Sequence, residues 1–302
     1  MNTIKKGRVC IVYRFGLAIV IKILPLAADD WVKSLWYHGL TANTECLKTL
    51  RFHNTRYEKI SHHQKYTFQW LYECPEYRNW LSSRASSLLF IEGKPGSGKS
   101  TLSRYFADHF EPPVNGAIVA KFFYSHREGE LERNHKSMLQ YLLNEILKKD
   151  ESFFIHFQQE FRNLGSPPKA WEYQKLKRVL GACLNHPLER SIFLIIDAMD
   201  ESDDRDRADI VNFLQEVSTP AEPTDKRRIV KIFLSSRPIN EIHPVYISAD
   251  QRIRLQEKNG GDIEKYTHNL LKKPIFSHYS NARGEIEDYI ISMQTGFFSG
   301  CV

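Results

Sequence analysis

Apolar residues follow two alternating patterns from about residue 87 onward. Short, nearly uninterrupted apolar runs have the length and character of buried parallel strands, and they lie at 87–91, 117–124, 192–196 and 229–234. A short fifth strand is predicted at 252–255. Between them, apolar residues recur at helical spacing over 101–107, 137–147, 171–184 and a segment that starts near Ser202. This alternation predicts an α/β fold, with a mostly parallel sheet and helices on both of its faces.

The chain before residue 87 has a different pattern. Apolar and aromatic residues fall at roughly helical intervals over 46–86, so short helices are expected there. Residues 1–28 contain no acidic residue, and their apolar stretch is interrupted by Arg14 and Lys22, which argues against a membrane span. A helix packed on the domain, a leader that does not order and a targeting segment all fit this stretch.

These patterns divide the chain into four predicted parts. They are an N-terminal extension at 1–44, a helical lead-in at 45–86, an α/β core at 87–270 and a helical tail at 271–302.

Composition narrows the classes of function. The formal net charge of +6 over 302 residues suits a polyphosphate ligand, and neither nucleic acid nor a membrane is an expected partner. The basic run 226–228 is short and has no interleaved aromatic residues, unlike a nucleic-acid patch. Five scattered cysteines without a C-x-x-C pair argue against a disulfide framework and a zinc site, and we expect a cytoplasmic protein.

The strongest motif follows the first apolar run. Residues 93–100 read GKPGSGKS, which matches the phosphate-binding P-loop pattern between a predicted strand and a predicted helix. Glycine lets the loop backbone approach phosphate oxygens, and the N–H groups at the start of the helix favour an anion. The predicted nucleotide-binding residues are Gly93, Lys94, Pro95, Gly96, Ser97, Gly98, Lys99, Ser100 and Thr101.

The apolar run 192–196 ends in Asp197, as a Walker B strand does. In P-loop proteins such an aspartate and the P-loop hydroxyl share one Mg²⁺ ion, so Asp197 and Ser100 are the predicted metal ligands. The alternative is an aspartate that only caps the following turn.

Three further residues are candidates for catalysis. Asp200 or Glu201 could orient or deprotonate an attacking water, although the acidic run 203–209 also fits a solvated helix start. Arg237 follows the fourth strand and could stabilise charge on a transferred phosphate, or it could be an ordinary surface arginine.

Several spaced motifs together resemble one family, the NACHT-type P-loop domain of the STAND NTPases in its nephrocystin-like form, as in fungal NOD-like receptors. The resemblance spans about residues 45–292. It is carried by 46–52, Arg56 and Ile60, 67–71, 77–81, 89–102, 195–201, 234–238 and 262–266.

The resemblance implies an ATP- or GTP-driven switch that uses Mg²⁺, with a sheet ordered 5-1-4-3-2. It places Asp197 on magnesium, Asp200 and Glu201 near the hydrolytic water, and Arg237 as a sensor of the nucleotide. It also implies signalling partners or self-association, and slow hydrolysis at most. Such proteins carry further effector, winged-helix and repeat segments, so this sequence is expected to be a truncated member. A freestanding kinase or metabolic NTPase and an inactive interaction remnant are the alternative interpretations.

Overall fold

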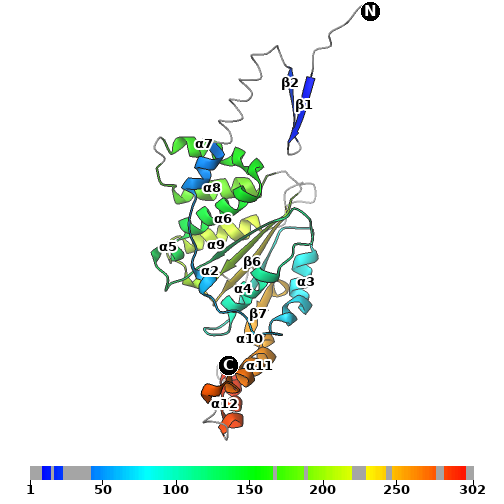
Figure 1. The fold of residues 1–302 in the computed structure, drawn as a ribbon, viewed down its shortest axis with the longest axis vertical. Helices are drawn as coiled ribbons and strands as arrows, with labels where there is room; N and C mark the ends of the chain where they lie inside the picture. Colours follow the sequence, from blue (N-terminus) through cyan, green and yellow to red (C-terminus); the bar gives the residue numbers. More distant parts are fainter. Residues whose placement is uncertain are drawn as a thin grey trace, which may run out of the picture.

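A computed structural model describes residues 9–14, 17–22, 42–165, 169–186, 190–219, 229–242, 247–276 and 282–296 (Figure 1). Its centre is a five-stranded sheet in the order β4-β5-β6-β3-β7, and every described strand pair in it is parallel. The strands are β3 (Ser87–Glu92), β4 (Ile118–Phe123), β5 (Ile192–Asp197), β6 (Val230–Ser236) and β7 (Arg252–Arg254). Numbered within the sheet, this order is the predicted 5-1-4-3-2, so the predicted topology is confirmed.

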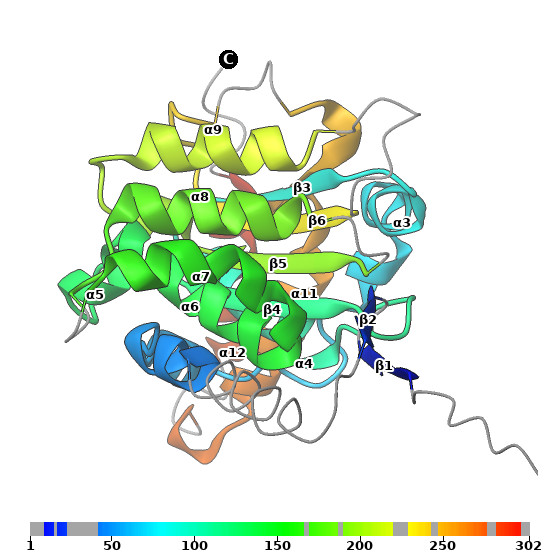
Figure 2. The same cartoon turned by 90° about the horizontal axis from the view of Figure 1, so that it is seen from above.

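Side chains alternate between the two sheet faces and build two apolar cores. Helices α6 (His135–Lys149), α8 (Tyr173–Leu184) and α9 (Arg207–Val217) contribute to one core, together with Phe90 and Phe122. Helices α3 (Pro75–Ser82) and α4 (Lys99–His109) contribute to the other, together with Phe193 and Phe233. Figures 1 and 2 show these two helical layers on opposite faces of the sheet. The prediction of helices on both faces is confirmed.

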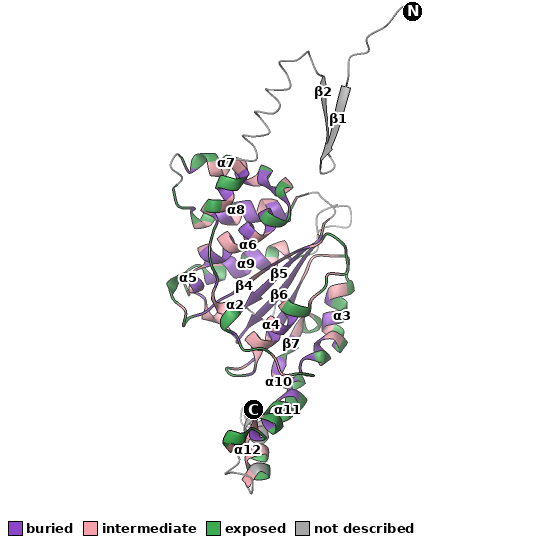
Figure 3. Cartoon of the chain, viewed as in Figure 1, coloured by how far each residue is buried: buried purple, intermediate pink, exposed green. Residues whose placement is uncertain are grey.

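The burial of the strands explains why their sequences are apolar runs rather than alternating patterns. Both faces of a parallel sheet are covered by helices, so most strand side chains are buried and apolar. Strands β5 and β6 are buried at every position (Figure 3).

The remaining helices connect and flank these layers. They are α2 (Arg56–Lys59), η1 (Gln69–Glu73), α5 (Glu130–Arg133), η2 (Glu151–Phe153), α7 (Phe154–Asn163), η3 (Met199–Glu201), η5 (Ala249–Gln251), α10 (Leu255–Lys258), α11 (Gly260–Leu271) and α12 (Arg283–Gly296). A further helix covers 42–49.

Helices in the lead-in are shorter than the apolar spacing suggests. Tyr66 and Phe68 have left-handed φ values of 69° and 64°, which a continuous helix does not allow. The Phe68 N–H, at the start of η1, is satisfied instead by the Asp262 carboxylate at 2.9 Å. A contact across the fold therefore decides where this helix begins.

Two expectations need correction. The helix expected to start near Ser202 starts at Arg207, because Ser202 is extended and Asp206 has φ 62°. The N-terminal extension, for which we allowed a helix, forms an antiparallel pair of strands, β1 (Val9–Arg14) and β2 (Leu17–Lys22). Valine and isoleucine dominate these two short segments, and β-branched residues favour strands.

Other expectations fall partly or wholly outside the described residues. The rest of the N-terminal stretch, at 1–8 and 23–41, is one such part, and the basic run 226–228 is another. Within the described residues, the apolar helices are all too short or too polar to cross a membrane.

Candidate functional site

The loop at 93–98 joins β3 to α4 at the carboxyl end of the sheet, which is where parallel sheets bind ligands. Gly96 and Gly98 have left-handed φ values of 74° and 88°, which favour glycine. Gly93 is needed for a different reason. A Cβ at this position would lie 2.5 Å from Ser97 Oγ, so the Ser97 side chain would have to move to make room for it.

Lys99 begins α4, and its side chain folds back over the loop. Its ammonium donates to the carbonyl oxygens of Gly93 at 2.6 Å and Lys94 at 2.9 Å. Burial lowers the pKa of Lys99, and the nearby charges of Asp200 and Asp197 partly offset this. The loop therefore presents a cation that is surrounded by backbone carbonyls and faces two acids.

Asp197 ends β5 and is fully buried. One carboxylate oxygen, Oδ1, accepts a hydrogen bond from the Ser235 hydroxyl, whereas Oδ2 is buried with no hydrogen-bond partner among the described residues. Burial raises the pKa of Asp197, and the hydroxyls of Ser235, Ser103 and Ser100 act in the opposite direction. A buried carboxylate oxygen without a partner beside a P-loop hydroxyl is the oxygen donor set that Mg²⁺ prefers. Asp197 and Ser100 therefore fit a magnesium ion.

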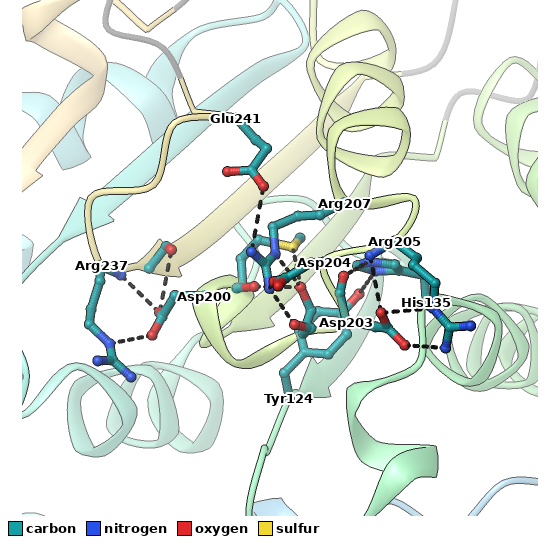
Figure 4. Close-up of polar contacts among 12 residues, drawn as sticks. Tyr124, His135, Asp200, Asp203, Asp204, Arg205, Arg207, Arg237 and Glu241 are labelled. Atoms are coloured by element: carbon teal, nitrogen blue, oxygen red, sulfur yellow. Dashed lines mark hydrogen bonds and ion pairs between the residues drawn. The ribbon is translucent and has the colours of Figure 1, made fainter.

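Asp200 and Arg237 form a close ion pair between η3 and the loop after β6 (Figure 4). The Arg237 side chain donates through Nε to Asp200 Oδ2 at 2.5 Å, and the Arg237 backbone N–H donates to Oδ1 at 2.8 Å. The Ser236 hydroxyl donates to the same Oδ1 at 3.3 Å. Both oxygens of Asp200 are thus occupied, and the carboxylate joins the ends of β5 and β6.

Glu201 points to a different neighbour. Its Oε2 accepts the backbone N–H of His126, in the loop after β4, at 3.1 Å. Among the described residues, Glu201 accepts one hydrogen bond whereas Asp200 accepts three, and Glu201 forms no ion pair. The two adjacent acids, which the sequence could not distinguish, therefore have different surroundings.

The acidic run that follows is paired with basic residues (Figure 4). Asp203 pairs with Arg205 at 2.8 Å, and Asp204 pairs with Arg207 at 2.5 Å. Arg207 also contacts the Ser202 hydroxyl at 2.9 Å. These acids fix the turn before α9, so they are distinct from the site around Lys99.

Most residues predicted for the site lie on the P-loop or at adjoining strand ends. Lys94, Pro95 and Thr101 lie on the loop or on the first turn of α4. Sequence reasoning missed Asn259, whose side chain donates to the Ser97 carbonyl at 2.9 Å and is buried. It also missed Ser235, which binds Asp197. Asn259 belongs to no motif of the sequence, and Ser235 lies in the motif 234–238 without that motif showing its contact to Asp197, because both residues act through tertiary contacts.

Comparison with known families agrees with the motifs. The profile described as "Nephrocystin 3, N-terminal" matches residues 66–237, which is more than half of the chain. The chain belongs to this nephrocystin 3 N-terminal family. The resemblance to a NACHT-like, nephrocystin-type P-loop domain is therefore confirmed, and the fold is that of an α/β P-loop NTPase.

Two individual proteins are also similar to this nephrocystin-type chain. The vegetative incompatibility protein HET-E-1 of Podospora anserina is 24% identical over 270 residues, which cover 84% of this chain and 19% of HET-E-1. This chain thus matches about a fifth of its relative's length. A structure of Drosophila ORC bound to DNA aligns with a TM-score of 0.43 and 12% identity, over 77% of this chain and 52% of that chain. Structural similarity at this low level identifies no function shared with ORC.

Proposed function

We propose that this chain is a nucleotide-binding module of a NOD-like signalling protein, which binds ATP or GTP with Mg²⁺ at the loop 93–100. The observation that carries this proposal is that a loop with the backbone shape of a phosphate-binding loop lies beside a fully buried carboxylate. The loop has two left-handed glycines before α4, and the Asp197 Oδ2 lacks any protein partner among the described residues.

Each part of the site has a chemical role in this proposal. The loop N–H groups and the start of α4 bind phosphate oxygens, because backbone dipoles there favour negative charge. Lys99, which now donates to two loop carbonyls, contributes its charge to the β- and γ-phosphates. Ser100 and Asp197 would hold the magnesium ion, and the ion would neutralise phosphate charge when bound.

The surroundings of the two acids support a division of roles. Asp200 accepts three hydrogen bonds, two of them from Arg237, so both of its carboxylate oxygens are already engaged. We therefore assign Asp200 to positioning Arg237, and Glu201 to accepting a proton from the attacking water. Any hydrolysis is expected to be slow.

The relative supports the wider role. HET-E-1 is named as a vegetative incompatibility protein, so a part in vegetative incompatibility, with self-association or binding of signalling partners, belongs to the same proposal.

Nucleotide binding tests the proposal directly. The melting temperature of the purified chain is measured with Mg²⁺ and ATP, ADP, GTP or GDP, and ligand at about 100 times its Kd should add about 2.7 kcal/mol to the free energy of unfolding. Lys99→Ala should weaken triphosphate binding by roughly 10- to 150-fold, since it removes charge-assisted hydrogen bonds.

Lys48→Ala is the matched control, because Lys48 is exposed and pairs only with the neighbouring Glu45. No thermal shift with any of the four nucleotides at millimolar concentration would exclude the proposal. Transfer of phosphate to an acceptor other than water would instead favour a kinase.

A further inference from the structure

Two residues of the lead-in fix its backbone beside the Walker B strand. The buried Asn54 side chain donates to the Phe123 carbonyl at 2.8 Å. Phe123 is the last residue of β4 and is the register partner of Asp197 on β5. The Thr55 hydroxyl donates to Glu132 at 3.1 Å. The next residue, Arg56, therefore begins α2 at the carboxyl end of the sheet, close to Asp197.

The Arg56 side chain lacks a hydrogen-bond or ion-pair partner among the described residues. Its Nε atom is buried and makes no hydrogen bond, and within the described residues Arg56 forms no ion pair. Arg104 and Arg252 also bury an Nε atom without a hydrogen bond. Unlike Arg56, however, both of them and the poorly exposed Arg207 form an ion pair with a carboxylate. Burying a guanidinium N–H without a partner costs free energy, because the group gives up water and gains nothing in exchange.

The Arg56 guanidinium lies near Asp197 but does not contact it. The two side chains are near enough to interact electrostatically, yet no ion pair within 4.0 Å joins them. Asp197 Oδ2 is likewise without a partner. Arg56 Nε and Asp197 Oδ2 are therefore two buried atoms of opposite charge type without a hydrogen-bond partner among the described residues. Such a pair fits a ligand that carries both a metal ion and an anion.

Arg237 gives the contrast. It is the arginine that the sequence motifs favour for sensing the nucleotide, but its Nε and its backbone N–H both bind Asp200. Its side chain is also 45% exposed. Of the two arginines, only Arg56 combines a buried donor with the absence of a carboxylate partner.

We propose that Arg56 binds the terminal phosphate of the nucleotide and makes the site selective for a triphosphate over a diphosphate. This inference rests on the proposed nucleotide binding. It adds a phosphate-sensing residue that comes from the lead-in rather than from the core. Arg56 is separated from the P-loop in sequence, so only the fold brings it to the site.

The test compares Arg56→Met with wild type by measuring Kd for a non-hydrolysable triphosphate analogue and for the diphosphate, both with Mg²⁺. Methionine keeps an apolar stem of similar length and removes the charge. We expect the triphosphate Kd to rise by about 10- to 150-fold, while the diphosphate Kd stays within about twofold. Arg51→Met is the control, because Arg51 is exposed at the end of the helix over 42–49, and it should change neither constant.

An equal rise in both constants, or no change in either, would overturn this inference while leaving the proposed nucleotide binding in place. Wild-type protein that binds neither nucleotide would overturn both proposals. If Arg56→Met does not fold, Arg56→Lys replaces it in the same comparison. Lysine keeps the charge and loses the planar fork, so a smaller loss confined to the triphosphate supports the inference, and an unchanged ratio of the two constants overturns it.

Discussion

Two buried charged residues at opposite ends of the five-stranded sheet, Lys231 and Asp197, differ in how fully their polar atoms are satisfied. Lys231, on β6, is 1% exposed, and its ammonium donates to the Trp80 carbonyl at 2.6 Å and to the Ser87 hydroxyl at 2.9 Å. These bonds join the end of α3 to the start of β3 at the amino end of the sheet. At the carboxyl end, Asp197 Oδ2 and Ser97 Oγ are buried without a hydrogen-bond partner among the described residues.

The difference separates a structural use of polarity from a functional one. Folded proteins satisfy nearly all of their buried polar groups, because an unmade hydrogen bond costs free energy. Lys231 follows this rule, because its two hydrogen bonds satisfy the buried ammonium. Buried atoms of Ser97, Asp197 and Arg56 depart from it, and an external ligand at the carboxyl end would complete their interactions. Residues with left-handed φ also occur at the carboxyl end, at Gly96, Gly98 and Ala198.

The largest expected effect at the carboxyl end concerns catalysis. Glu201→Gln should lower nucleotide hydrolysis by about 10²- to 10⁴-fold and leave nucleotide affinity nearly unchanged, because it removes only the proposed general base. Single-turnover assays with protein in excess would measure this, since the starting rate is expected to be low. Asp200→Asn should lower the rate less, through the loss of the Arg237 contact. Wild-type rates for both variants would contradict the assignment of these two acids.

A second expected effect concerns the metal. Asp197→Asn should remove the Mg²⁺ dependence of triphosphate binding, because the carboxylate that neutralises the ion is lost. The ratio of the Kd values measured with EDTA and with Mg²⁺ should fall to about 1 for this variant. A ratio as large as that of wild type would show that the metal is held elsewhere, and the unpartnered Oδ2 would then need another explanation.

The amino end predicts an effect on stability rather than on binding. Burial lowers the pKa of Lys231 to about 8, below its ordinary value of 10.5. Below pH 8 both the folded and the unfolded chain are protonated here, so the cost of burying the charge is fully present. Above pH 8 the folded state releases its proton while the unfolded state keeps it, so stability relative to Lys231→Met should rise with pH.

Urea unfolding at several pH values measures this effect. Between about pH 8 and pH 10, the free energy of unfolding of wild type should rise relative to Lys231→Met by on the order of 3 kcal/mol. Lys48→Met is the control, because Lys48 is exposed, and its difference from wild type should be flat with pH. A flat profile for Lys231→Met as well would mean that Lys231 is not buried as a cation.

The smallest expected effects come from a matched pair of glycine substitutions. Gly93→Ala places a Cβ 2.5 Å from Ser97 Oγ, 3.1 Å from Lys99 Cγ and 3.3 Å from Leu255 Cβ, and such overpacking costs about 1–3 kcal/mol. Gly261→Ala, in α11, meets nothing within 4 Å and should stabilise the fold by about 0.4–1 kcal/mol. Thermal unfolding of both variants would measure the contrast, and equal effects would show that the loop tolerates a side chain at Gly93.

Secondary structure was predictable wherever local sequence dominates. The five strands of the sheet and the helices of the core follow from buried apolar runs and helical spacing, and their order follows from the family resemblance. The start of α9 was not predictable, because the Arg207 contacts to Ser202 and Glu241 hold the preceding turn out of the helix. The helix allowed for the N-terminal extension was wrong, since a short apolar segment suits either a helix or a strand until its pairing is known.

By itself, the sequence determined which chemistry this protein carries. A glycine loop before a helix and an acid after a buried strand are local patterns, and their geometry follows from backbone conformation at those residues. Only the tertiary structure decided which polar groups already have a hydrogen-bond or ion-pair partner. The fold pairs Asp200 with Arg237, although the adjacent Glu201 has the same type of side chain. It leaves the buried Nε of Arg56 without a hydrogen-bond partner among the described residues. Hydrogen bonds between distant segments depend on how helices and strands pack, and no single segment of the sequence contains that information.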